Sequence, residues 1–107
     1  MARYLLIESR NSWESGDVAY FYGLARELAG AGNDVTLFLV QNGVMPARQG
    51  AQDGGLKELA GKVKVQADGF SLRERAIPKD ALVSGVAVSD VDAVVDLLAQ
   101  GAKAIWH

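Results

Sequence analysis

Short apolar runs separate longer segments of mixed character along this chain. Residues 4–7 and 35–40 are almost entirely apolar, a pattern typical of strands that are buried on both faces of a sheet. Residues 63–67 alternate between apolar and polar side chains, which indicates a partly exposed strand. Two shorter apolar runs follow at residues 86–88 and 104–106. The pattern therefore predicts about five strands.

The intervening segments predict helices, because their apolar residues recur every three or four positions. The longest of them, residues 12–31, predicts a helix with one buried face and with Ser12 or Ser15 as its N-cap. Residues 41–55 contain four glycines and predict a loop. Residues 56–60 then predict a brief helix.

Three further helices are expected in the second half of the chain. Ser71 and Glu74 have the spacing of a capping box, which predicts a short helix that begins near Ser71. Pro78 favours another helix start, and this helix should run through Leu82. A last helix is expected after a cap at Ser89. Its predicted inward stripe consists of Val91, Val94, Val95 and Leu98.

The alternation of strands and helices favours a parallel sheet that is covered on both faces and connected by right-handed crossovers. We therefore expect an α/β fold, a three-layer α/β/α arrangement with a mostly parallel sheet of about five strands. The chain has 107 residues and no linker-like tract, so we expect a single domain over residues 1–107.

Composition and charge narrow the range of functions. Eleven Lys and Arg against thirteen Asp and Glu give a formal net charge of −2, so nucleic acid is not an expected partner. No apolar run reaches the roughly 18 residues that a membrane span needs, and the first apolar run is too short for a signal peptide. We expect a cytoplasmic protein with no membrane contact.

The residues that the chain lacks limit its chemistry. It has no cysteine, which excludes disulfides, thiolate metal ligands and thiol nucleophiles. His107 is the only histidine and ends the sequence, where a structural or incidental role is expected. No phosphate-binding P-loop and no Gly-x-Ser-x-Gly elbow occur. We therefore predict no cofactor and no metal site, and we nominate no catalytic residue.

Asp68 follows the third predicted strand directly, at the edge of a parallel sheet where ligands usually bind. One interpretation is structural, because Asp accepts backbone N–H bonds ahead of a helix and Gly69 supplies a turn. The other is functional, with an ionised carboxylate that faces a crevice near a helix N-terminus. Arg75 is likewise either an anion ligand or a solvated helix charge. The candidate ligand-binding residues are Ser9, Asn11, Trp13, Asn42, Gly43, Asp68, Gly69, Ser71 and Arg75.

Two stretches resemble a known family. The second strand with its loop, LFLVQNGV, and the third strand running into ADGFSLRERAI are similar to the DsrE/DsrF-like family of small sulfur-relay proteins, which includes subunits of the Tus and Dsr complexes. In members that carry sulfur, a cysteine after the third strand takes up a persulfide, and Asp68 stands at that position here. Ala76 replaces a glycine that is frequent in the family. The resemblance implies the fold and a habit of forming homo-oligomers or rings with sister subunits, without persulfide transfer.

Three hypotheses follow. The first is a non-catalytic DsrE-like subunit in sulfur metabolism that assembles through apolar surface with copies of itself or with sister subunits. The second is a small-molecule or anion-binding module with its pocket at the Asp68 junction. The third, ranked last, is an enzyme in which Asp68 acts as nucleophile or general base, with Glu8 or Glu14 as the complementary group.

Overall fold

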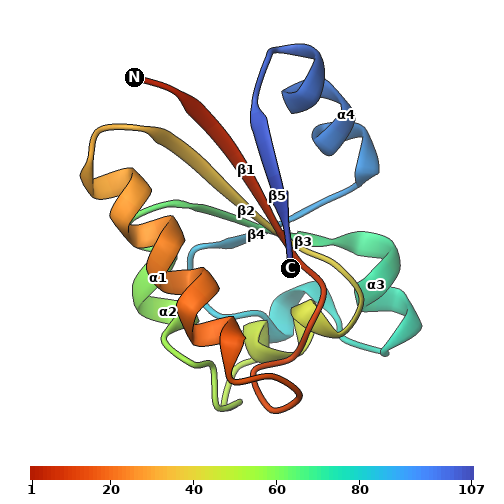
Figure 1. Ribbon diagram of the computed structural model, residues 1–107. Coiled ribbons are helices and arrows are strands. Elements are labelled where there is room, and N and C mark those ends of the chain that lie inside the picture. Colours follow the sequence, from red (N-terminus) through yellow and green to blue (C-terminus); the bar gives the residue numbers. More distant parts are fainter.

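A five-stranded parallel sheet forms the centre of the computed structural model, which describes residues 1–107 (Figure 1). The strands are β1 (Arg3–Glu8), β2 (Asp34–Leu39), β3 (Lys64–Asp68), β4 (Val86–Ser89) and β5 (Lys103–Trp106). Their order in the sheet is β4-β3-β2-β1-β5, and each neighbouring pair is parallel. The predicted α/β class and five-stranded parallel sheet are therefore confirmed.

Helices cover the two faces of this sheet unequally. The helices are α1 (Asp17–Gly30), α2 (Leu56–Leu59), α3 (Gly69–Glu74) and α4 (Val91–Ala99), with 3₁₀ turns η1 (Gln41–Ala47) and η2 (Lys79–Ala81). Figure 1 shows α1 and α2 on one side of the sheet and α4 on the other. The core follows the same division, with 17 buried residues in the larger cluster and three, Leu5, Ile7 and Phe38, in the smaller one.

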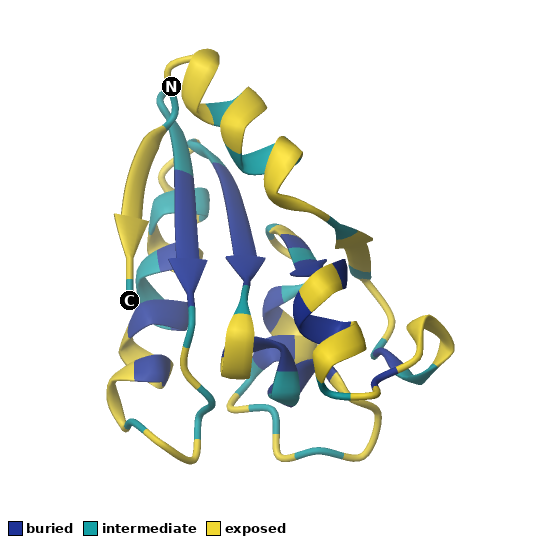
Figure 2. Cartoon of the chain, turned by 90° about the vertical axis from the view of Figure 1, so that its right-hand side faces the viewer, coloured by how far each residue is buried: buried dark blue, intermediate teal, exposed yellow.

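Of the four residues predicted to face inward from α4, only Val94 packs on the sheet. Val94 and Leu97 lie against the smaller core cluster, whereas the predicted inward residues Val91, Val95 and Leu98 are exposed. Figure 2 shows the helix exposed along much of its length. Both stripes are apolar and each has helical spacing, so periodicity alone does not decide which one faces the sheet. No residue of α4 is fully buried.

Several element starts also differ from the prediction. Helix α1 begins at Asp17 and not near residue 12; Ser15 Oγ accepts from the Asp17 amide at 3.2 Å, while Gly16 occupies the N-cap position. The expected helix after Pro78 is only the three-residue turn η2. Asp90, not Ser89, caps α4, because its carboxylate accepts the bond from the Asp92 amide.

None of the helices combines the length and the apolar stretch required to cross a bilayer.

Candidate functional site

The Asp68 junction is built around a buried carboxylate that begins α3. Asp68 Oδ2 accepts from the Ser71 amide at 2.9 Å and from the Ser71 hydroxyl at 2.7 Å. Asp68 and Ser71 are 5% and 4% exposed. The expected start near Ser71 is wrong by two residues, since α3 begins at Gly69 and Ser71 lies in its first turn. The carboxylate is thus committed to capping the helix.

Ser71 and Arg75 join α3 to the loop that follows β2. The Ser71 hydroxyl accepts from the Gln41 amide at 2.8 Å. Arg75 donates from Nε and Nη2 to Asn42 Oδ1 at 3.0 and 2.9 Å, and from Nη1 to the Ser71 carbonyl at 3.2 Å. No carboxylate forms an ion pair with Arg75. Its guanidinium therefore holds α3 and η1 in a fixed relation.

A pocket of about 710 Å³ lies where β1, β2 and β3 end. It contains five of the nine candidate residues: Ser9, Asn42, Asp68, Ser71 and Arg75. Glu14, which the third hypothesis named as a possible partner of Asp68, also lines the pocket. The other lining residues, which were not predicted, are Arg10, Val40, Gln41, Phe70, Glu74 and Trp106. Ligands of α/β proteins bind in this place, beyond the carboxyl ends of the strands. The sequence located the edge of the sheet correctly and missed the aromatic residues of the pocket.

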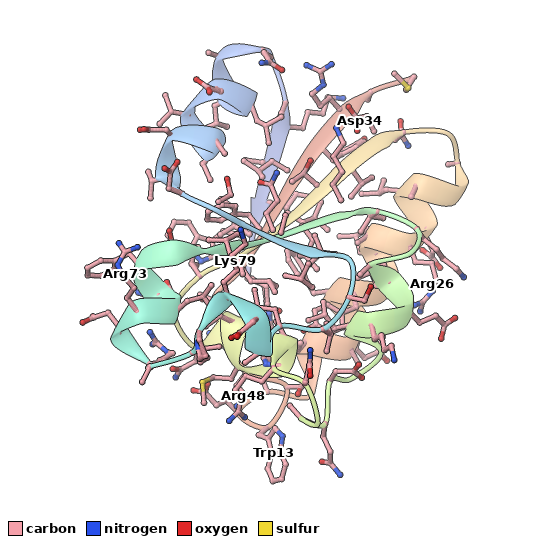
Figure 3. All side chains as sticks on the ribbon, turned by 180° about the vertical axis from the view of Figure 1, so that it is seen from behind. Trp13, Arg26, Asp34, Arg48, Arg73 and Lys79 are labelled. Atoms are coloured by element: carbon pink, nitrogen blue, oxygen red, sulfur yellow. The ribbon has the colours of Figure 1, made fainter.

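The remaining four candidates do not line this pocket. Gly69 borders a separate pocket of about 450 Å³ between α3 and the start of α4. The Asn11 amide donates to Glu14 Oε1 at 3.1 Å within the first loop. Trp13 is 72% exposed, and Figure 3 shows it at the tip of a loop, pointing away from the body of the protein.

Gly43 holds the two loops of the pocket together. A Cβ atom at this position would overlap the main-chain carbonyl of Glu8, so only glycine allows η1 to approach the end of β1 this closely. The Val40 amide also donates to the Glu8 carbonyl, at 3.0 Å. Gly43 therefore contributes to the pocket by allowing its two loops to pack together, and it does not line the pocket itself.

A second buried carboxylate, Glu8, was not nominated for the ligand site. Its side chain is fully buried, and both oxygens lie close to His107 Nδ1, at 2.7 and 2.9 Å. The Arg10 amide donates to Glu8 Oε2 at 3.0 Å, and the ring of Phe21 lies 5.3 Å from that of His107. A glutamate that directly continues an apolar strand is a signal for such a pair, because a buried carboxylate requires a partner.

The same region changes the chemistry of Tyr22. Burial, followed by the negative charges of Glu8 and Asp53, raises the pKa of the Tyr22 hydroxyl well above its ordinary value of 10.0. This hydroxyl is buried and has no hydrogen-bond partner. Tyr22 therefore remains neutral and contributes to the α1 side of the core.

The pocket can bind a ligand through polar and charged side chains, and it contains no thiol. Arg10 and Arg75 bring positive charge, and Asp68, Glu14 and Glu74 bring negative charge. The His107 side chain is not among the lining residues. No cluster of three or more potential metal ligands occurs in the chain.

Comparisons with known proteins address the fold. No protein-family model matches the chain, and no curated protein matches it. Two solved structures superpose on it over the full length of both chains. One is MTH1491 from Methanobacterium thermoautotrophicum, a protein of unknown function, with a TM-score of 0.87 and 22% identity. The other is the YchN protein from E. coli, with a TM-score of 0.87 and 18% identity.

The chain shares the fold of these two proteins. This agrees with the resemblance noted from LFLVQNGV and ADGFSLRERAI at the level of architecture. Identities of 22% and 18% show the fold alone, because one fold hosts many different activities.

Proposed function

We propose that this chain is a non-catalytic, DsrE-like cytoplasmic subunit in sulfur metabolism, one domain that assembles with copies of itself or with sister subunits. The observation that carries the proposal is the state of Asp68. The resemblance puts a persulfide-carrying cysteine at this position, and here the side chain is a carboxylate that caps α3 through Ser71. A carboxylate cannot hold a persulfide. It keeps the helix start, and with it the shape that a partner subunit would contact.

Uncovered apolar surface supports the assembly. Val91, Val95 and Leu98 form an exposed apolar stripe along α4. Contiguous exposed apolar residues of this kind usually mark an interaction surface. The four residues of β5 are also exposed, although parallel strands are normally covered on both faces.

Light scattering coupled to size-exclusion chromatography tests the assembly. The wild-type chain should elute as an oligomer, and Leu98→Asp should shift it toward the monomer. Tyr20→Asp is the matched control, because Tyr20 is an exposed aromatic residue on α1, away from the α4 stripe. A strictly monomeric wild type, with no sister subunit recovered by pull-down, would contradict the proposal.

Mass spectrometry after incubation with polysulfide tests the non-catalytic part. The wild-type chain should gain no sulfur, whereas Asp68→Cys should gain the mass of one or more sulfur atoms. Sulfane sulfur bound covalently to the wild-type chain would refute the assignment.

The pocket supports a second candidate function, a small-molecule or anion-binding module. Its volume of about 710 Å³ lies within the usual range for ligand sites of about 300–1,000 Å³. A thermal-shift screen of nucleotides, sulfur oxyanions and thiols tests this function. At least one compound should raise the melting temperature, and a screen without any shift counts against the pocket as a ligand site.

A further inference from the structure

Two exposed aromatic side chains border the 710 Å³ pocket from different elements. Trp106 comes from the end of β5 and is 69% exposed, and Phe70 comes from the first turn of α3 and is 61% exposed. Large aromatic side chains are usually covered, so two of them at one pocket require an explanation. Neither takes part in an aromatic pair within the chain.

The sheet sets the separation between these two residues. β5 and β3 are separated by β1 and β2, which makes three strand-to-strand steps. Each step is about 4.8 Å, so the ends of β5 and β3 are about 14 Å apart across the sheet, and Phe70 follows the end of β3 by two residues, in the first turn of α3. Stacked rings have centroids about 4.5–7 Å apart, so one ring placed between two others spans about 9–14 Å in all. Both side chains line the pocket at these strand ends, so a planar group held in the pocket can contact both rings.

The charges of the pocket indicate what kind of planar group it would take. Three carboxylates and two guanidinium groups line it, so a polyanion would meet no net attraction. Asn42 Oδ1 is occupied by Arg75, which leaves the Asn42 amide group free to donate. The Glu74 carboxylate takes part in no ion pair, so it is free to accept a hydrogen bond. A donor and an acceptor that line the same pocket match the edge of a heteroaromatic base.

We propose that the pocket binds a neutral planar heteroaromatic ring of the nucleoside class, stacked between Trp106 and Phe70. Asn42 and Glu74 bond to the edge of the ring. This inference rests on the second candidate function, the small-molecule pocket, and names its ligand class. It favours a ring over the free anions that the same pocket was first expected to hold.

The chain offers a matched pair of fluorescent reporters, because it has two tryptophans and only Trp106 lines the pocket. Trp13→Phe leaves Trp106 as the reporter, and Trp106→Phe leaves Trp13. Adenosine and guanosine are titrated into each variant at millimolar concentration, with inorganic phosphate as the charged control. At least one nucleoside should quench Trp13→Phe saturably, while Trp106→Phe and the phosphate titrations stay unchanged.

Phe70→Leu, made in the Trp13→Phe background, tests the second wall. Leucine keeps apolar bulk and removes the flat ring, so the Kd for the nucleoside should rise by roughly fivefold to a hundredfold, the effect of losing one stack. An unchanged Kd would overturn the sandwich. Equal quenching of Trp13 and Trp106 would also overturn it, because that result indicates collisions in solution.

The remaining outcomes separate this inference from the function on which it rests. If neither nucleoside quenches Trp106 but thiosulfate or a thiol raises the melting temperature, the pocket stands and the ligand class is wrong. If nothing binds, both fail. If Trp106 is shielded from acrylamide in an oligomer seen by light scattering, a neighbouring subunit covers the pocket and the inference is overturned.

Discussion

Replacing Asp68 with alanine removes the carboxylate oxygen that caps the N-terminus of α3. That oxygen accepts from the Ser71 amide and the Ser71 hydroxyl, and both residues are buried. Loss of an N-cap costs about 0.5–2 kcal/mol, and a buried donor left without an acceptor costs about 1–3 kcal/mol. Because the two bonds share one acceptor, the effects do not add fully, and the free energy of unfolding should fall by about 2–3 kcal/mol.

Urea unfolding followed by far-UV circular dichroism measures this change. In a thermal scan it corresponds to a fall in melting temperature of about 10–20 °C. Asp68→Asn is the control, since its amide oxygen can accept both bonds, and it should cost less than about 1 kcal/mol. A free energy for Asp68→Ala within about 0.5 kcal/mol of the wild type would refute the capping role. An Asn variant as unstable as the Ala variant would assign the effect to charge.

Three further predictions concern stability. Gly43→Ala should lower the melting temperature by the equivalent of about 1–3 kcal/mol or more, because its Cβ would overlap a carbonyl of β1, while Gly16→Ala, in open space, should be tolerated. In the monomer, Leu97→Ala should lower the free energy of unfolding in urea by about 1–2 kcal/mol, and Leu98→Ala should lower it by less than about 0.5 kcal/mol. A larger loss for Leu98→Ala than for Leu97→Ala would indicate that Leu98 faces the sheet, as the sequence predicts. Burial raises the pKa of Tyr22, so above pH 10 the hydroxyl loses its proton on unfolding, and the free energy of unfolding should fall as the pH rises past that point. In Tyr22→Phe the free energy of unfolding should fall less steeply with pH. The same pH profile in both proteins would contradict this role of Tyr22.

The central strands β1 and β2 could be predicted from the sequence because they are largely buried. Residues 4–7 and 35–40 have to be apolar throughout, and few other structures produce such short runs. The predicted helix starts were less accurate than the predicted strands. A serine and an aspartate are both good caps, so the choice between Ser89 and Asp90 depends on the backbone at the junction.

The orientation of α4 could not be predicted for a different reason. Val91, Val95 and Leu98 make as good an apolar stripe as Val94 and Leu97, and only packing against β1 and β2 distinguishes them. A helix with a single apolar stripe has one predictable buried face, because that stripe packs on the neighbouring element. A helix with two apolar stripes gives no such answer, and its second stripe is the surface for which the assembly is proposed.

The candidate site was predicted in part, for reasons of distance along the chain. Asp68, Ser71 and Arg75 are neighbours in sequence, so a local motif identifies them together. Trp106 reaches the same pocket from the other end of the chain, and no local pattern connects it with Phe70. The pairing of Glu8 with His107, 99 positions apart, was missed for the same reason.

The position of β5 has a consequence for how the pocket forms and opens. Its pairing with β1 joins residues almost a hundred positions apart, as the bond from Ser9 to the His107 carbonyl illustrates. Contacts of such high sequence separation form late in folding, because the entropy of closing a long loop comes first. β5 is also an edge strand with all four residues exposed, so it belongs to the part of the molecule that unfolds locally at the lowest free energy. Hydrogen exchange should therefore be faster in β5 than in β1 and β2, and the tryptophan side of the pocket should detach while the rest of the sheet remains folded.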